Sequence, residues 1–86
     1  MQGFSDIVGK AETILESRHQ KYGRQNISRF GEQGVVIRLS DKIERLINMT
    51  PRCYGSDETV EDTYFDIINY AVIGLMIRRG QWPPES

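Results

Sequence analysis

The stretch from Val35 to Asn48 reads VVIRLSDKIERLIN, and it decides the fold class. Its apolar residues recur every three or four positions, which is the spacing of one face of an α-helix. This apolar stripe consists of Val36, Leu39, Ile43, Leu46 and Ile47. Four charged residues stand at positions i, i+3, i+4 and i+7 and therefore share a second face. They are Arg38, Asp41, Lys42 and Arg45. The stretch predicts an amphipathic helix with a charged stripe.

Helical spacing recurs in three segments of the chain, at about 5–22, 32–49 and 58–79. Ser5 followed by Asp6 is typical of an N-cap and a first helical turn. Gly23, Pro51 and Gly80 are expected to end the three helices in turn. Since no stretch shows a strand pattern, we expect an all-α fold. The prediction is a small bundle of three main helices, in one domain over 1–86 with a tail at 80–86, completed by oligomerisation.

Composition excludes several classes of function. The chain has 86 residues, a formal net charge of −1 and a pI near 5.8, so binding to a nucleic acid polymer is not expected. No apolar run is long enough to span a bilayer, and no signal peptide is visible. Cys53 is the only cysteine and His19 the only histidine, which leaves no internal disulfide, zinc set or catalytic triad. We therefore expect a cytoplasmic protein without a membrane partner.

A second polar stripe lies on the third helix, where Asp62, Asp66 and Asn69 stand at i, i+4 and i+7. The residues from Tyr70 to Ile77 are apolar on every side, as expected of a helix buried in a bundle or an oligomer. A carboxylate on such a helix needs a cation, because an isolated buried charge is costly. The basic stripe of the second helix is the expected partner. Two facing stripes form either a structural seam of ion pairs or a polar pocket.

The residue types allow specific contacts if the stripes form a pocket. Arginine presents a planar fork that suits phosphate, and lysine adds a point charge beside it. Asp and Asn can bind a base or a sugar hydroxyl, or hold Mg²⁺ through oxygen ligands. Near the end of the chain, Trp82 is expected to pack against a neighbouring helix or subunit. His19 is expected to be a surface residue or a helix C-cap.

Three segments carry a family resemblance: HQKYG (19–23), FGEQGVVIRLSDKIERLINM (30–49) and ETVEDTYFDIINYAVIGLMIRRG (58–80). They look like the nucleotide modification associated domain found mainly in bacteriophages, a family similar to the all-α MazG and dimeric dUTPase group of nucleoside triphosphate pyrophosphohydrolases. The most specific positions are Arg38, Asp41, Lys42, Arg45, Glu61, Asp62, Thr63, Asp66, Asn69 and Tyr70. The resemblance implies a small, helical, oligomeric, phage-encoded protein that handles nucleotides, and it favours the pocket over the seam.

The pattern departs from those pyrophosphohydrolases at the metal site. They hold Mg²⁺ with Glu-x-x-Glu on one helix and Glu-x-x-Asp on the next. The nearest equivalents here are Asp41-x-x-Glu44 and Asp62-x-x-x-Asp66, and the second pair has a different spacing. Because phosphoryl chemistry usually needs a metal, this departure favours binding over turnover, with no cofactor. Under the enzyme alternative, Mg²⁺ would be held by Asp41, Glu44, Asp62 and Asp66.

Three functions therefore remain open. The first is a non-catalytic nucleotide binder that sequesters a host signalling nucleotide, such as a cyclic oligonucleotide or a cyclic ADP-ribose derivative, in the host cytoplasm. The second is a Mg²⁺-dependent (deoxy)nucleoside triphosphate pyrophosphohydrolase, and the third is a structural helical oligomer. The ligand would lie between helices or at a homo-oligomer interface. Its predicted contacts are Arg38, Asp41, Lys42 and Arg45 on one wall, and Asp62, Asp66 and Asn69 on the other.

Overall fold

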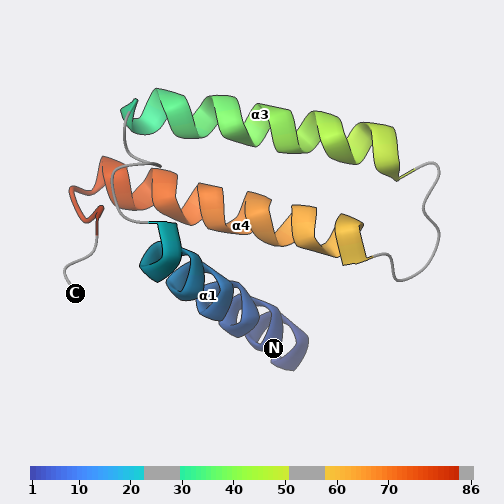
Figure 1. Cartoon of the computed structure of the whole chain (residues 1–86). Coiled ribbons are helices and arrows are strands. Elements are labelled where there is room, and N and C mark those ends of the chain that lie inside the picture. Colours follow the sequence, from blue (N-terminus) through green and yellow to red (C-terminus); the bar gives the residue numbers. More distant parts are fainter. Residues whose placement is uncertain (23–29, 51–57, 84–86) are drawn as a thin grey trace.

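Residues 1–22, 30–50 and 58–83 are described by the computed structural model, and they form three helices (Figure 1). The helices are α1 (Gln2–Tyr22), α3 (Gly31–Met49) and α4 (Glu58–Arg78). No strand occurs in these described residues. The prediction of an all-α bundle of three main helices is confirmed, with bounds within three residues of those expected.

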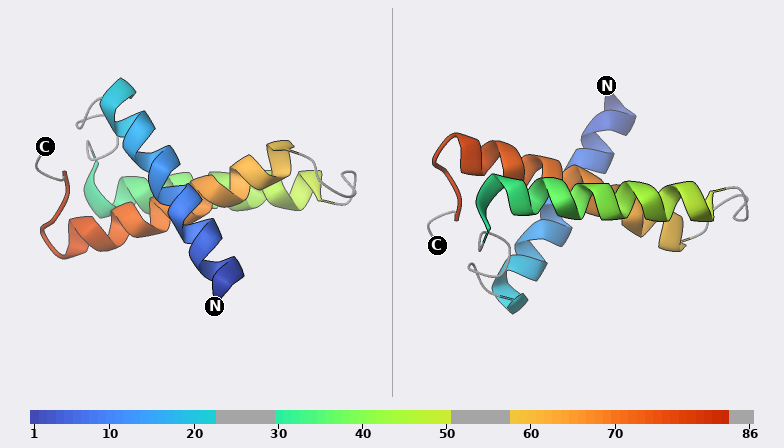
Figure 2. Two further views of the ribbon diagram at one scale, coloured as in Figure 1. Left: turned by 90° about the horizontal axis from the view of Figure 1, so that it is seen from below. Right: turned by 90° about the horizontal axis from the view of Figure 1, so that it is seen from above.

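Helix α4 is the central element of the bundle. Helix α3 runs antiparallel beside it, and α1 crosses its other side obliquely (Figures 1 and 2). The buried apolar side chains come from all three helices, and they are Ala11, Val35, Leu46, Phe65 and Ile73. Because α4 lies between the other two helices, residues of α1 and α3 come together at side chains of α4 that both helices contact.

The face that α3 turns to α4 differs from the predicted apolar stripe. Val35 and Leu46 are buried, whereas Val36, Ile43 and Ile47 are exposed. Lys42 lies between Val35 and Leu46 on the helix surface, at i+7 and i−4. Only part of the predicted apolar stripe is therefore buried in this chain. The side of α3 that packs against α4 is rotated away from the centre of that stripe. This rotation brings Lys42 toward α4.

The first helix begins before the expected cap. Both the backbone N–H and the Oγ of Ser5 donate to the Met1 carbonyl oxygen, each at 3.1 Å. The prediction that Ser5 is an N-cap is wrong, because an acceptor four residues earlier lets the helix continue in front of it. The expected stops at Gly23 and Pro51 lie outside the described residues.

Gly80 ends α4 as predicted. Its φ is 69°, a left-handed conformation that glycine adopts without the strain caused by a side chain. The Gly80 N–H donates to the Ile77 carbonyl at 3.1 Å, and the Gln81 N–H donates to the Met76 carbonyl at 2.7 Å. These paired bonds satisfy carbonyls that the last turn would leave open. They also turn the chain back so that Trp82 reaches α1.

The C-terminal half of α4 is only partly covered. Val72 and Leu75 are exposed, although the sequence from Tyr70 to Ile77 is apolar on every side. The expectation of burial all round is therefore not met within this single chain, and its completion by other copies stays a prediction. Among the described residues, no helix is long and apolar enough to cross a membrane.

Candidate functional site

The two predicted stripes meet at one ion pair between α3 and α4. Lys42 Nζ lies 2.9 Å from Asp66 Oδ2. Lys42 reaches this position because it shares a helix face with the buried Val35 and Leu46. The Asp66 side chain is 12% exposed and the Lys42 side chain 25% exposed. The contact expected between a basic α3 and an acidic α4 is therefore present at this pair.

A second cation, which sequence reasoning did not select, reaches Asp66 from α1. Arg18 Nη1 donates a hydrogen bond to Asp66 Oδ1. Arg18 follows Ala11 and Leu15 at i+7 and i+3, so it extends the row of α1 that packs on α4. That row is the signal in the sequence that could have pointed to Arg18. Together Arg18, Lys42 and Asp66 form a cluster in which each residue comes from a different helix, called the ion cluster below.

Burial and the neighbouring cations shift the pKa of the Asp66 carboxyl in opposite directions. Burial would raise the pKa of the Asp66 carboxyl, but hydrogen bonds from Arg18 and Lys42 and the charges of both lower it below its ordinary value. The hydrogen bond to Asp66 likewise raises the pKa of the Arg18 guanidinium, and the nearby charge of Asp62 acts in the same direction. Asp66 is therefore ionised at neutral pH, and two cations surround one carboxylate.

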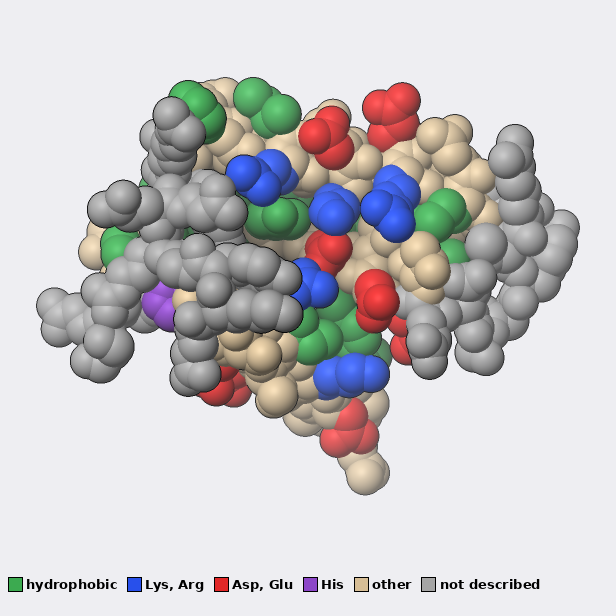
Figure 3. All heavy atoms as spheres, in the orientation of Figure 1, with side chains coloured by type: hydrophobic (Ala, Val, Ile, Leu, Met, Phe, Trp, Pro, Cys, Tyr) green, Lys and Arg blue, Asp and Glu red, His purple; other side chains and the backbone are tan. Residues whose placement is uncertain are grey.

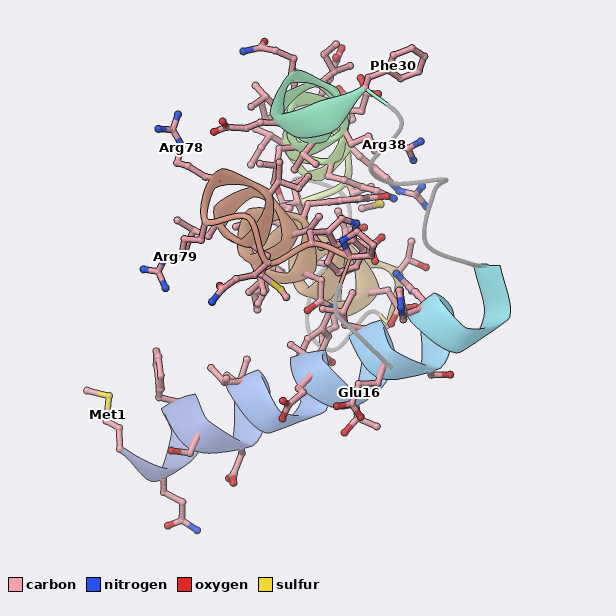
Figure 4. The ribbon with its side chains drawn as sticks, turned by 90° about the vertical axis from the view of Figure 1, so that its left-hand side faces the viewer. Met1, Glu16, Phe30, Arg38, Arg78 and Arg79 are labelled. Atoms are coloured by element: carbon pink, nitrogen blue, oxygen red, sulfur yellow. The ribbon has the colours of Figure 1, made fainter. Side chains whose placement is uncertain are left out.

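The remaining predicted residues of α3 lie beside the ion cluster. Arg38 is half-buried, and Asp41 and Arg45 are exposed. None of the three makes an ion pair with another described residue. Figure 3 shows Lys and Arg side chains in a row along α3, with acidic side chains above and below them. Arg38 points to one side of the bundle, whereas Arg78 and Arg79 point to the other (Figure 4). Among the described residues, Arg38 and Arg45 thus have no carboxylate paired with them.

Asn69 is turned toward α1 and away from α3. Its Nδ2 donates to the Ala11 carbonyl oxygen at 3.1 Å, and both residues are buried. A buried amide with a backbone partner stabilises the docking of α1 on α4. A ligand contact at Asn69 stays a prediction, while the structure assigns the amide to packing between helices. Asp62 is exposed one turn before Asp66.

No metal cluster is assembled in the described part of the chain. Within residues 1–22, 30–50 and 58–83, no three Asp, Glu, His or Cys residues come together closely enough to hold an ion. Asp66 also faces Arg18 and Lys42, whose positive charges oppose a cation there. Asp41, Glu44, Asp62 and Asp66 are therefore not brought together as one group among the described residues, and the Mg²⁺ set of the enzyme alternative stays a prediction.

A separate groove of about 390 Å³ lies between α1 and α4. Its walls are mostly apolar, with Glu12 and Glu16 at its edge and His19 and Trp82 among its lining residues. The His19 and Trp82 rings meet edge to face with 5.3 Å between centroids, so the prediction that Trp82 packs against a neighbouring helix is confirmed. Because its two carboxylates repel anions, this groove is a poor place for phosphate.

Comparison with known families gave one match. A family model described as "Nucleotide modification associated domain 1" matches residues 30–77, more than half of the chain. No curated protein and no solved structure matched. The matched segment contains α3 and nearly all of α4, and hence Lys42 and Asp66, but it leaves out Arg18. It is also shorter than the resemblance expected from about His19 to Gly80.

Proposed function

Because the chain belongs to the nucleotide modification associated domain 1 family, we propose that it binds a nucleotide through phosphate groups on the basic side of α3. The main support is the contact between Lys42 and Asp66, which joins the two helices of the family segment at one charged point. Lys42 stands between Arg38 and Arg45 along the same side of α3. Three cations in a row are suited to an anion with several oxygens.

Arg38 and Arg45 also support this role, because neither forms an ion pair with another described residue. A surface ion-pair seam would match each cation with a carboxylate, whereas Arg38 and Arg45 have no such partner among the described residues. An arginine fork can donate two parallel hydrogen bonds to a phosphate. In our proposal, Asp41 and Asp62 at the edge of this face accept hydrogen bonds from sugar hydroxyls or from base amino groups.

We favour binding without turnover. Asp66 is occupied by two cations, and a phosphoryl-transfer enzyme usually relies on a metal near such a carboxylate. A binder needs cations and burial but no metal. The proposed role is sequestration, in which the protein holds a signalling nucleotide, such as a cyclic oligonucleotide or a cyclic ADP-ribose derivative, away from another protein.

The first experiment is a thermal-shift panel of linear deoxynucleotides, cyclic oligonucleotides and cyclic ADP-ribose derivatives, with and without Mg²⁺. A ligand that binds only the folded state raises the midpoint temperature. The stabilising ligand is then recovered and chromatographed. Recovery of intact nucleotide supports sequestration. Mg²⁺-dependent release of pyrophosphate would instead identify a pyrophosphohydrolase.

Two variants tie binding to the proposed face. We expect Arg38→Ala and Arg45→Ala each to weaken affinity for the stabilising nucleotide about tenfold, the effect of losing a hydrogen bond to a charged group. Arg79→Ala is the matched control, since it removes one positive charge on the other side of the bundle (Figure 4). If both variants bind like the control, the proposed face is wrong. If they change only self-association, the charged stripe belongs to a structural oligomer.

A further inference from the structure

We infer that Arg18 is a phosphate-binding residue and that Asp66 is the positioning residue that joins Arg18 of α1 and Lys42 of α3 into one clamp for linked phosphates. The inference rests on the proposed function and deepens it in two ways. It adds a binding residue that lies outside the family segment 30–77. It also gives Asp66 a role that differs from direct contact with the ligand.

Burial increases from Arg18 through Lys42 to Asp66. The Arg18 side chain is 48% exposed, Lys42 25% and Asp66 12%. The carboxylate therefore lies beneath two cations that solvent can reach. A guanidinium has five N–H donors and an ammonium three, and Asp66 accepts one hydrogen bond from Arg18 and makes one close contact with Lys42. Several donors of each cation remain for a ligand on the outer side.

A ligand phosphate could instead displace Asp66 and take both cations. That exchange would leave a largely buried carboxylate without a partner, which is strongly unfavourable. A phosphate that binds the outer donors avoids this cost and keeps both cations in place. Geometry therefore favours a ternary arrangement in which Asp66 stays below, Arg18 and Lys42 lie above it, and the phosphate lies outermost.

Linked phosphates suit this face better than a single phosphate. Arg38 and Arg45 are seven residues apart, so the α3 row extends about 10 Å along the helix axis. Arg18 adds a fourth cation beside the middle of that row, because it shares Asp66 with Lys42. The ligand chemistry is thus two or more phosphates in one molecule, found both in a linear nucleoside polyphosphate and in a cyclic dinucleotide.

The test measures the affinity of the whole chain for inorganic pyrophosphate by calorimetry, at constant ionic strength and without metal. We expect Arg18→Ala to lose about tenfold in affinity and Arg18→Lys to lose less, because lysine keeps the charge without the fork. Arg79→Ala removes the same charge elsewhere and should stay near the wild-type value. An Arg18→Ala affinity equal to that of Arg79→Ala overturns the assignment.

Whether Asp66→Asn weakens or tightens pyrophosphate binding tests the positioning role of Asp66. Removing a negative charge from a phosphate site should tighten binding if charge alone matters. If Asp66 is a positioning residue, we expect weaker binding, because Arg18 and Lys42 lose the carboxylate that holds them side by side. Asp6→Asn makes the same charge change at an exposed position on α1 and should not weaken binding. Tighter binding by Asp66→Asn overturns the role of Asp66.

Coupling between Arg18 and Asp66 in their effects on pyrophosphate affinity distinguishes a positioning role of Asp66 from a general loss of structure. Once Arg18 is alanine, Asp66→Asn should weaken binding less than it does in the wild type, and additive effects would contradict the clamp. If Asp66→Asn does not fold, as judged by circular dichroism, the comparison of Arg18→Lys with Arg18→Ala decides, because Arg18 is about half exposed.

Two outcomes distinguish this inference from the proposed function. If the wild type binds neither pyrophosphate nor any nucleotide of the panel, both fail. If binding depends on Arg38 and Arg45 but not on Arg18, the proposed function stands and the clamp alone fails. Replacing pyrophosphate with a linear nucleoside triphosphate and with a cyclic dinucleotide then identifies which source of linked phosphates binds more tightly.

Discussion

Asp66 connects the three helices through a single carboxylate, since it contacts Arg18 of α1 and Lys42 of α3 from its place on α4. Surface ion pairs contribute little because water screens them and their side chains lose freedom. Asp66 differs because its side chain is mostly buried, so its charge depends on those two partners. The Arg78–Glu32 pair, at 3.0 Å, joins α3 and α4 through more exposed groups and gives a useful contrast.

The stabilising effect of Asp66 should depend on pH. Its pKa in the folded chain lies below the ordinary value of 3.8, so the stabilisation is fully present above about pH 3.8 and is lost as pH falls through the lower folded pKa. We expect Asp66→Asn to lower the free energy of unfolding by about 1 kcal/mol at pH 7, the net contribution of a partly exposed charged pair.

This prediction is checked by urea unfolding of wild type and Asp66→Asn between pH 7 and pH 2.5. The difference between the two proteins should be constant down to about pH 4 and then shrink. Asp62→Asn, which changes an exposed carboxyl of the same helix, serves as the control. A difference that persists unchanged to pH 2.5 would mean that the ionised carboxylate does not stabilise the fold.

At the scale of elements, the α3–α4 hairpin and α1 are held in different ways. Helices α3 and α4 lie side by side along their length (Figure 1). Helix α1 crosses α4 and is held there by Ala11 packing, by the Asn69 hydrogen bond to the Ala11 carbonyl, and by Arg18. Phe4, Ile7 and Val8 in its first half are exposed. The placement of Arg18 at the ion cluster therefore depends on the part of α1 that lies against α4.

Gly74 gives an element-scale prediction about the hairpin. A Cβ at this position would lie 3.5 Å from Val35 Cγ1, an ordinary packing distance. Alanine also has a higher helix propensity than glycine inside a helix. We expect Gly74→Ala to raise the free energy of unfolding by about 0.5–1 kcal/mol, measured by urea denaturation.

Gly34 supplies the matched comparison for that measurement. A Cβ at Gly34 would lie 2.9 Å from Phe30 Cβ, so Phe30 must shift before alanine fits. Gly34→Ala should therefore stabilise less than Gly74→Ala or destabilise the chain. If Gly74→Ala is the more damaging of the two, α3 and α4 pack more tightly than these distances indicate.

The molecule as a whole has a small core for the apolar surface it carries. Five hydrophobic residues are buried among those described, while Phe4, Ile7, Ile37 and Ile47 are among the exposed ones. Chains of this size bury a modest fraction of their surface, and additional burial between copies would stabilise them. The exposed residues lie on α1 and on the outer side of α3, so self-association is expected to involve these two surfaces.

This expectation is tested by sedimentation velocity over a range of protein concentrations. We predict a homo-oligomer, weakened by Ile7→Ser and by Ile47→Ser because each removes apolar area from an association surface. Asp6→Ser changes an exposed polar neighbour on α1 and should leave association unchanged. A chain that stays monomeric at every concentration would show that these apolar residues face solvent and that the oligomer prediction is wrong.

Local spacing in the sequence determined the helices and the charged faces. The 3.6-residue period places Arg38, Lys42 and Arg45 together on α3 whatever the helix packs against. It also puts Asp66 on the polar stripe of α4, and the cost of a buried charge predicts a basic partner for it. The all-α class, the end of α4 at Gly80 and the expectation of a basic partner on α3 for Asp66 follow from these local rules.

Only the tertiary structure decided which neighbours each stripe meets. Arg18 is 48 residues from Asp66 in the sequence, and their contact depends on the angle at which α1 crosses α4. The same crossing turns Asn69 toward Ala11, and the rotation of α3 buries Val35 while leaving Val36 exposed. A periodic sequence specifies which side chains share a face. The direction of that face depends on how whole helices fill space against one another, which no short segment encodes.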